Sequence, residues 1–481
     1  MHRVEGDYWA CQILVNFAPS YGIIISALVS SWKETLTETT IIKNGVVITL
    51  NERNQIYQDG SVLIEDNRIV DVGPSDNISR GKRVDNTIDA RGKAVLPGFV
   101  NLHAHSGLIR GTAEDLPLWE WLERHVDPKH KVLRAKDAYA ASSLCYTEMI
   151  KAGITTVLDM YRFMHRCADA AEEVGIRAVL APYVADKPEY DYFEKQNDNI
   201  ELIRKRHGSA NGRIHVWMGL EHLVYCSEEA YHRAREYADK FNVGIHTHGE
   251  ESKEMAAKLE KEYGFSPIEV LHKRRILTPK TVLAHCVWVT PREIELLAKA
   301  GTSVAHCPVS NMKLASGVAP ILDYLRQGVN VGLGTDGVKE NNRLDMIQEM
   351  KIAGLLQKVT HLDAAALPAN TLLRMATING AKALGLGEEI GSLERGKRAD
   401  IIILNLTSPH MSPALTGEFF NIVSNIVYAA IPSDVETVLV DGKIVMQKRK
   451  VLTVDEEEVV ARHKAAAEEL LERRKPFVPK E

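Results

Sequence analysis

Apolar runs alternate with long helical stretches through the middle of the chain. The first run ends at His103, and seven more follow at residues 155–159, 178–181, 215–219, 243–248, 281–285, 302–306 and 329–334. Short buried strands that alternate with helices are typical of parallel sheets. Eight such strands predict an α/β fold, a (β/α)8 TIM barrel, over residues 97–387.

Both flanks of this region have a different pattern. Short strand-like runs separated by turns occupy residues 40–95, and similar runs return at residues 399–404, 435–440 and 443–446. An Asn-Gly pair at residues 44–45, between two β-branched runs, predicts a hairpin. We expect segments 39–96 and 388–452 to form one composite β-sandwich beside the barrel. Residues 453–481 are expected to form a charged C-terminal helix.

The first 38 residues are harder to place in a fold. Their apolar run, residues 11–29, is interrupted by Asn16, Pro19, Ser20 and Gly22, which makes it a poor membrane span and a poor signal peptide. We interpret residues 1–38 as an irregular extension and expect no membrane partner.

Composition narrows the class of protein. The chain has 481 residues and a formal net charge of -5, so no global positive field favours nucleic acid as a partner. Its six cysteines are scattered and form no metal-binding or disulfide spacing, which favours a reducing, cytoplasmic setting.

Titratable residues collect at the predicted carboxyl ends of the barrel strands. His103 and His105 are two positions apart, so their side chains point to the same face of a strand. His248, His285 and Asp336 end three later strands. The carboxyl ends of parallel barrel strands meet at one face of the barrel. Three of these imidazoles together with the carboxylate suit one zinc or iron(II) ion with an open position for water.

The sequence around these residues resembles the amidohydrolase superfamily. The similarity is greatest to the chlorohydrolase and deaminase branch, which includes methylthioadenosine/S-adenosylhomocysteine deaminases and triazine hydrolases. It extends over residues 41–452. The matching motifs are PGFVNLHAHSGLIRG (97–111), HTHGEES (246–252), LAHCVWV (283–289), AHCPVSNMKLASGVAP (305–320), GLGTDGVKENNRLDM (332–346) and GSLERGKRADIIIL (391–404).

The resemblance assigns roles to the matching residues. It implies a metal site whose ligands are His103, His105, His248 and Asp336, in which Asp336 also takes a proton from the metal-bound water. Glu251 would act as the acid and base, and His285 would polarise the attacking oxygen. No lysine stands where a bridging lysine would be needed, so a single ion is expected. Zinc is the first choice, with iron(II) as the alternative.

The implied reaction is hydrolytic deamination of an amino-substituted nitrogen heterocycle. Water activated on the metal attacks a ring carbon, and ammonia leaves. The first hypothesis for the substrate is an adenosine-type nucleoside, as in the methylthioadenosine/S-adenosylhomocysteine deaminases. The alternatives are deamination of a free base (guanine, pterin or cytosine type) or of an aminotriazine, and dechlorination of a triazine. The expected partners are this small molecule and further copies of the chain.

Four residues are candidates for substrate selection. Trp121 matches an aromatic position that can pack on a heterocycle. Trp119 stands where the relatives usually carry an acidic residue for ribose, and Glu221 where they carry a histidine for the purine ring. Glu340 stands where they often carry serine. Since a carboxylate accepts hydrogen bonds, Glu221 favours a ring that presents N–H groups.

Other polar residues have simpler interpretations. We expect His246 to face away from the site as a core histidine, and His306 to orient its loop through Asn311. Asp159 is interpreted as a loop anchor. A hypothesis from a different class is a metal-free, non-catalytic scaffold with the same fold.

Overall fold

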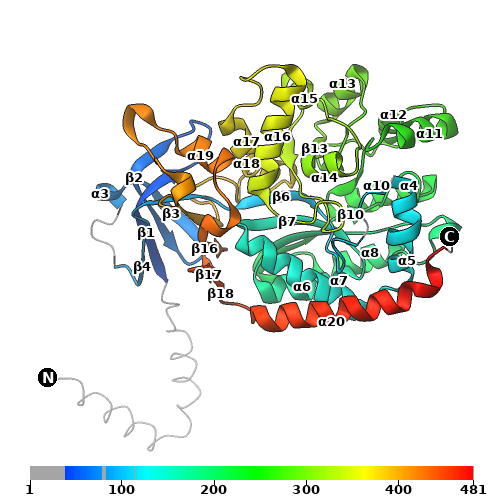
Figure 1. The fold of residues 1–481 in the computed structure, drawn as a ribbon, viewed down its shortest axis with the longest axis horizontal. Coiled ribbons are helices and arrows are strands. Elements are labelled where there is room, and N and C mark those ends of the chain that lie inside the picture. The colour runs from blue at the N-terminus through cyan, green and yellow to red at the C-terminus, as the bar shows by residue number, and fades with distance from the viewer. Residues whose placement is uncertain (1–37, 79–82, 113, 117, 480–481) are drawn as a thin grey trace, which may run out of the picture.

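Parallel strands form the centre of the computed structural model, which describes residues 38–78, 83–112, 114–116 and 118–479 (Figure 1). Four of them form one sheet, in the order β6 (Phe99–Ala104), β7 (Ile154–Tyr161), β8 (Arg177–Pro182), β9 (Ile214–Val216). Five form a second sheet, in the order β10 (Met218–Gly219), β11 (Ile245–His248), β12 (Thr281–Ala284), β13 (Ser303–His306), β14 (Val331–Leu333). All eight predicted strands are present, and their α/β alternation is confirmed.

The two parallel sheets meet at both edges. On one side only Trp217 separates β9 from β10. Backbone pairing continues there, since Trp217 N donates to the Leu180 carbonyl of β8 at 2.9 Å. The side chain of Asn199 also binds this junction, donating to the Trp217 carbonyl at 2.9 Å and accepting from Gly219 N at 2.9 Å. On the other side Asp336 N donates to the His103 carbonyl at 3.0 Å. The predicted strand at residues 215–219 is therefore split, and the ladders form two sheets instead of one continuous sheet.

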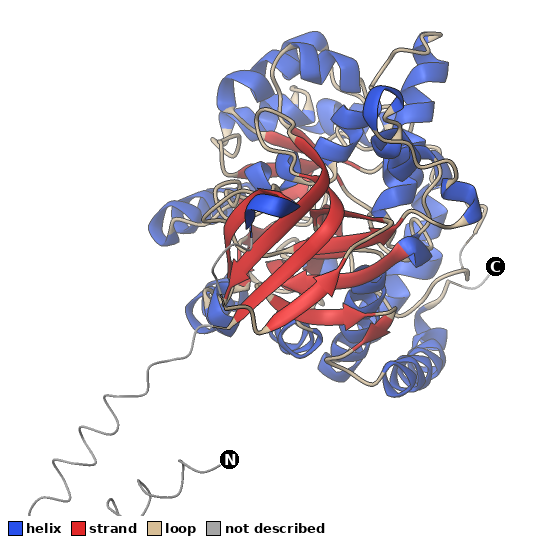
Figure 2. Ribbon diagram, turned by 90° about the vertical axis from the view of Figure 1, so that its left-hand side faces the viewer, coloured by secondary structure: helices blue, strands red, loops and turns tan. Residues whose placement is uncertain are grey.

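Helices surround these strands, which are buried on both faces as in other helix-covered parallel sheets (Figure 2). Helix α10 illustrates the local signals, because Ser227 caps its first turn and Asn242 ends it in the left-handed conformation. The main helices are α6 (Ala135–Lys151), α7 (Met164–Val174), α8 (Gln196–Arg206), α10 (Glu228–Phe241), α11 (Lys253–Tyr263), α12 (Pro267–Lys273), α13 (Pro291–Ala300), α14 (Pro308–Lys313), α15 (Ile321–Arg326), α16 (Met346–His361), α17 (Ala369–Met375), α18 (Ile378–Ala383) and α19 (Ile422–Tyr428).

Both ends of the described chain contribute to a nine-stranded sheet beside the parallel strands (Figure 2). Its order is β18-β17-β16-β15-β5-β1-β2-β3, with β4 paired to β1. Side chains of the sheet's own strands form an apolar core separate from that of the parallel strands, which includes Ile42, Val62, Ile64, Ile401 and Ile403. The strands are β1 (Thr39–Ile48), β2 (Ile56–Glu65), β3 (Arg68–Pro74), β4 (Asn86–Asp89), β5 (Lys93–Pro97), β15 (Ile401–Asn405), β16 (Val435–Val440), β17 (Lys443–Gln447) and β18 (Lys450–Val451).

The predicted hairpin at Asn44-Gly45 is wrong. Strand β1 runs through both residues, and its register with β2 shifts on either side of Gly45. Asn44 takes a left-handed φ of 65°, and a Cβ on Gly45 would lie 2.8 Å from the Ala90 Cβ. The pair therefore forms a bulge in a continuous strand, where the same conformational freedom is needed as in a tight turn.

Two ion pairs join outer elements to the central part of the fold. Arg177 of β8 forms a buried bidentate ion pair with Asp400, at 2.8 and 2.9 Å, which ties the nine-stranded sheet to the centre. The predicted C-terminal helix is confirmed as α20 (Glu456–Arg474), which lies along α6 and is held there by the Arg473–Asp137 ion pair (Figure 1).

Short helices complete the fold. They are α3 (Ser75–Ile78), α4 (Leu118–Trp121), the π-helix η1 (Leu122–Val126), α5 (Asp127–Val132) and α9 (Ser209–Gly212). Within the described ranges no helix is long and apolar enough to cross a membrane. The predicted irregular extension, apart from Glu38, lies outside the described residues.

Candidate metal centre and active site

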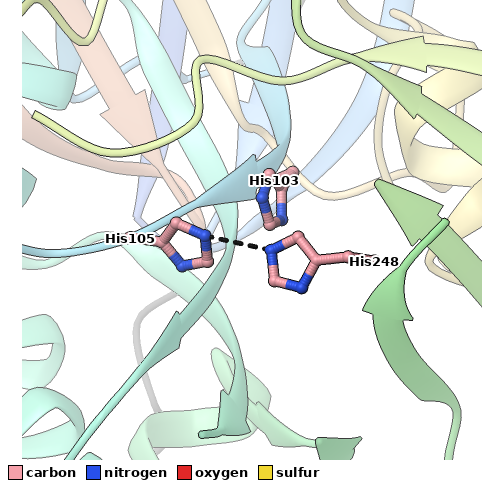
Figure 3. A group of neighbouring side chains, drawn as sticks. All are labelled: His103, His105 and His248. Atoms are coloured by element: carbon pink, nitrogen blue, oxygen red, sulfur yellow. Dashed lines mark hydrogen bonds between the residues drawn. The ribbon is translucent and has the colours of Figure 1, made fainter. Parts of the chain in front are cut away.

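Three histidines converge at the carboxyl ends of the parallel strands (Figure 3). His103 lies one residue before the end of β6, and His105 directly follows that strand. His248 is the last residue of β11. All three are buried, and ligand atoms of the three lie within 4.8 Å of one another. The Nε2 atoms of His105 and His248 are 3.3 Å apart. The structure thus brings these three predicted residues together.

Backbone carbonyl groups fix the rings of His105 and His248. His105 Nδ1 donates to the Met160 carbonyl at 2.7 Å, and His248 Nδ1 donates to the Glu221 carbonyl at 2.5 Å. A neutral imidazole that donates from Nδ1 keeps a lone pair on Nε2. Burial lowers the pKa of both rings, so the neutral, ligating form is favoured.

His246 fixes the ring of His103, which corrects the expectation that it faces away. His246 Nδ1 donates to the Val282 carbonyl at 2.9 Å, so its Nε2 is free to accept from His103 Nδ1 at 2.8 Å. Residues 246 and 248 are two positions apart and share a face of β11, as alternation along a strand requires. The H-x-H pattern at 246–248 was the sequence signal for this supporting role.

Asp336 supplies a carboxylate to the same cluster. Its Oδ1 lies 3.5 Å from His103 Nε2 and 3.3 Å from His105 Nε2, and its Oδ2 accepts from Ser310 Oγ at 2.6 Å. Burial alone would raise the pKa of this carboxyl. The neighbouring imidazoles of His103, His285 and His105 hold that pKa well below its usual range, which favours the ionised carboxylate.

The donor set fits a divalent metal ion. His103 Nε2 is buried and has no hydrogen-bond partner among the described residues, although its ring is fixed from the other side. Neutral imidazole nitrogens and a carboxylate oxygen are the ligands that zinc takes in catalytic sites. Rings oriented by a second hydrogen bond are also typical of metal ligands.

His285 and Glu251 lie beside this cluster. His285 Nδ1 donates to Asn311 Oδ1 at 3.0 Å, and its Nε2 lies 3.9 Å from Asp336 Oδ2. Burial would lower the pKa of His285, but the charges of Glu251 and Asp336 raise it. Burial raises the pKa of Glu251, whose Oε1 accepts from Ser316 Oγ at 3.4 Å. His285 and Glu251 therefore line one cavity, and the pKa of each is shifted upward there.

Of the simpler interpretations, the structure contradicts that of His306 and supports that of Asp159. Asn311 bonds His285 and not His306, so the prediction for His306 is wrong. The loop-anchor prediction for Asp159 is confirmed, because it accepts from both the backbone nitrogen and the hydroxyl of Ser106, at 2.9 and 2.7 Å.

The same cavity has a second wall made of loop residues. Trp121 and Glu221 line it together with Lys339 and Glu340. Lys339 Nζ lies 5.2 Å from the centre of the Trp121 ring and forms an ion pair with Glu340. Lys339 was missed in the sequence, where nothing distinguishes it from a surface lysine. Trp119 belongs to α4, but its side chain lies outside the described part of the chain.

Glu221 presents an unsatisfied oxygen. Its Oε2 is buried and has no hydrogen-bond partner within the described ranges, whereas its backbone carbonyl holds His248. Burial and the nearby charges of Asp127 and Glu251 raise the pKa of its carboxyl well above the usual range. An unsatisfied buried acceptor is costly unless a ligand supplies a donor.

Known proteins are similar to this chain in sequence and in fold. The model of the amidohydrolase family matches residues 94–445. A 5'-deoxyadenosine deaminase of Methanosarcina mazei is 41% identical over 438 residues, which cover 90% of this chain and 98% of that protein. A 5-methylthioadenosine/S-adenosylhomocysteine deaminase of Desulforudis audaxviator is 42% identical over 417 residues, 86% of this chain and 95% of that protein.

Solved structures agree with the sequence matches. A zinc-bound adenosine deaminase from Xanthomonas campestris superimposes with a TM-score of 0.85 at 30% identity, covering 90% of this chain and 98% of that one. A zinc-bound atrazine chlorohydrolase from Arthrobacter aurescens gives a TM-score of 0.82 at 26% identity, covering 89% of this chain and all of that one.

Proposed function

The chain belongs to the amidohydrolase family, and on that premise we propose that it is a metal-dependent hydrolytic deaminase of an adenosine-type substrate. It would be a hydrolase of carbon–nitrogen bonds in cyclic amidines, and ammonia would be its product. One observation carries the proposal: a buried donor set for a metal shares a single cavity with Glu251 and His285. The filled donor set and the deaminase relatives argue against a metal-free scaffold.

We assign His103, His105, His248 and Asp336 as ligands of one zinc ion, with iron(II) as the alternative. The support is the set of three oriented imidazoles and one ionised carboxylate. When bound, such an ion would lower the pKa of a water molecule to about 7 and so would supply a nucleophile at neutral pH.

The remaining steps belong to this chain's own side chains. Asp336 accepts a proton from the attacking water, and His285, oriented by Asn311, donates a hydrogen bond to the oxygen that becomes negative. Glu251 protonates a ring nitrogen, recovers a proton from the added hydroxyl group and delivers that proton to the leaving amine; the proton taken up by Asp336 then returns to Glu251. Burial raises the pKa of Glu251 above its ordinary value, which favours the protonated carboxyl that this step needs.

The substrate would lie against the second wall of the cavity. We assign Trp121 to packing on the heterocycle and Glu221 to its N–H groups, with Trp119 as a further contact. The unsatisfied oxygen of Glu221 favours a second candidate function, deamination of a free base or aminotriazine whose ring presents N–H donors. Triazine dechlorination is the third, since it differs only in the leaving group.

We also propose how the segments of the chain form domains. The two parallel sheets close into a (β/α)8 barrel over residues 97–387, and the nine-stranded sheet folds on its own core as a β-sandwich of 39–96 with 388–452. The helix α20 (Glu456–Arg474) forms the helical end of this architecture. A cytoplasmic location is supported by the free thiols of the described cysteines. Assembly into a homo-oligomer is also part of the proposal.

Ammonia release tests the function directly. Zinc-loaded protein is incubated with 5'-deoxyadenosine, methylthioadenosine, adenosine, guanine, pterin, cytosine and an aminotriazine. Release from the nucleosides supports the first candidate, and release only from free bases or the triazine supports the second. His103→Ala removes activity and metal together, whereas His232→Ala, at an exposed position of α10, leaves both intact. An active, metal-free preparation would overturn the proposal.

A further inference from the structure

A second, smaller cavity adjoins the metal-binding cavity. Both are lined by His105, His130 and Lys339. Lys129 of α5 and Leu470 of α20 also line the smaller one, whose volume is about 30 Å³. This volume has room for a water molecule or for a substituent of a few atoms.

Lys129 is a buried cation without a counter-ion in the described structure. Its residue is 7% exposed, and its Nζ makes no hydrogen bond or ion pair with any described residue. The neighbouring charges of Lys339 and Arg474 are positive, and the one opposing charge, Glu340, already pairs with Lys339. Burial lowers the pKa of Lys129 to about 7. An unpaired buried ammonium is costly, so an anion at this position would stabilise it.

His130 adds a second unsatisfied group beside Lys129. Its ring lies against Phe193, with 5.3 Å between the centres, and meets Tyr183 edge-on at 5.5 Å. Its Nδ1 is buried and has no hydrogen-bond partner among the residues described. Burial lowers the pKa of this ring, and the positive charges around it act in the same direction. A neutral ring protonated at Nδ1 would offer one N–H donor.

We propose that this cavity is an anion subsite that receives one carboxylate group, held by Lys129 Nζ and His130 Nδ1. The group is a carboxylate on the heterocyclic substrate or a free carboxylate ion. The small volume and the nearby charge of Glu340 disfavour a phosphate, which is larger and carries more negative charge. The inference rests on the proposed function only where the carboxylate belongs to the substrate.

Acetate is the probe for the subsite itself. Saturation-transfer NMR with the full chain, zinc-loaded and metal-free, compares the wild type with Lys129→Met and with Lys131→Met, an exposed position on the same helix. The expected result is an acetate signal in the wild type and Lys131→Met that falls about fivefold or more in Lys129→Met, with or without metal. An unchanged signal in Lys129→Met overturns the subsite. Lys129→Gln repeats the test if the methionine variant does not fold.

A matched pair of rings identifies the source of the carboxylate. Pterin and pterin-6-carboxylate differ only in that group, so their kcat/KM ratio reports its recognition. A preference of about tenfold for the carboxylated ring, lost in Lys129→Met and kept in Lys131→Met, supports a substrate carboxylate. Acetate binding controlled by Lys129 without such a preference supports a free ion. If neither ring is deaminated, the free-base candidate loses support and a substrate carboxylate on a pterin is ruled out, the nucleoside panel still decides the proposed function, and the acetate experiment still decides the subsite.

Discussion

The two walls of the active-site cavity differ in how well their polar atoms are satisfied. On the metal side, every ligand histidine has its Nδ1 in a hydrogen bond, and Asp336 accepts one from Ser310. On the opposite wall, buried oxygens of Glu221 and Glu340 and the indole nitrogen of Trp121 have no partner among the described residues.

This difference teaches which part of the site the fold determines. The ligand side chains lie at or beside strand ends, where the sheet fixes the backbone and neighbouring segments supply acceptors for the rings. The opposite wall comes from loops and short helices, whose polar atoms are completed by the ligand. We therefore expect substitutions on the metal side to abolish the reaction and those on the loop side to change its specificity.

Asp336→Asn should have the largest effect, because it removes both a metal ligand and a proton acceptor. We expect kcat/KM to fall by more than about 10⁴-fold, with loss of bound metal. Ammonia release and metal analysis of the purified protein measure the two effects. Asp191→Asn, at an exposed carboxylate, should match the wild type. A metal-free Asp336→Asn protein with wild-type turnover would contradict the assignment.

Glu251→Gln should separate proton transfer from metal binding. The amide keeps the shape of the side chain but cannot deliver a proton, so kcat should fall by about 10³-fold while metal content stays at the wild-type level. Steady-state kinetics and metal analysis test this together. The control is Glu254→Gln in the first turn of α11, on the solvent side. Metal loss in Glu251→Gln would mean that this carboxylate belongs to the metal side.

His246→Phe should weaken the metal site without removing a ligand. The phenyl ring cannot accept the His103 Nδ1 hydrogen, so we expect metal affinity to fall about 10- to 100-fold. Competition with a chelator measures that affinity, and excess zinc should restore much of the activity. His232→Gln serves as the exposed control. Equal affinity in His246→Phe and the wild type would remove His246 from the metal side.

Lys129→Met should change how stability depends on pH. The pKa of Lys129 is about 7 in the folded protein, against an ordinary value of 10.5, so the unfolded chain binds more protons between these values. The free energy of unfolding of the wild type should therefore rise with pH across this window, relative to the variant. The advantage of Lys129→Met should be greatest at or below pH 7.

Thermal unfolding at pH 6.5 and 9.5, without added carboxylates, measures this effect, the smallest of these. We expect the difference in Tm between Lys129→Met and the wild type to change by about several degrees between the two pH values. Lys131→Met should follow the wild type at both values, since that lysine is exposed. If the Tm of the wild type and that of Lys129→Met changed with pH in parallel, burial would not lower the pKa of Lys129 in the folded protein.

Strand period and parallel strand ends predict that His103, His105, His248, His285 and Asp336 lie near one another, and the structure brings them together. Which of them would hold a metal came only from the resemblance to a known family. Lys129 and Lys339 could not be found in this way. Their burial depends on how α5, α20 and the loop after β14 meet in space, and isolated lysines are normally solvent-exposed.

The Asn44-Gly45 error has a related cause. A left-handed residue followed by glycine serves equally in a turn and in a bulge, and only the partner strand decides between them. The Ala90 side chain, which packs against Gly45, comes from the segment between β4 and β5, so the local pattern of β1 does not contain it.

The pairing of β5 with β15 has a consequence for how the protein is made. These neighbours in one sheet are about 300 residues apart in the chain, and a ribosome adds about 5–20 residues per second. The first five strands therefore leave the ribosome roughly 15–60 s before their partner exists. During that interval β5 presents an open edge that can pair with another nascent chain. Slower synthesis at the same temperature should lengthen this interval and lower the yield of folded protein.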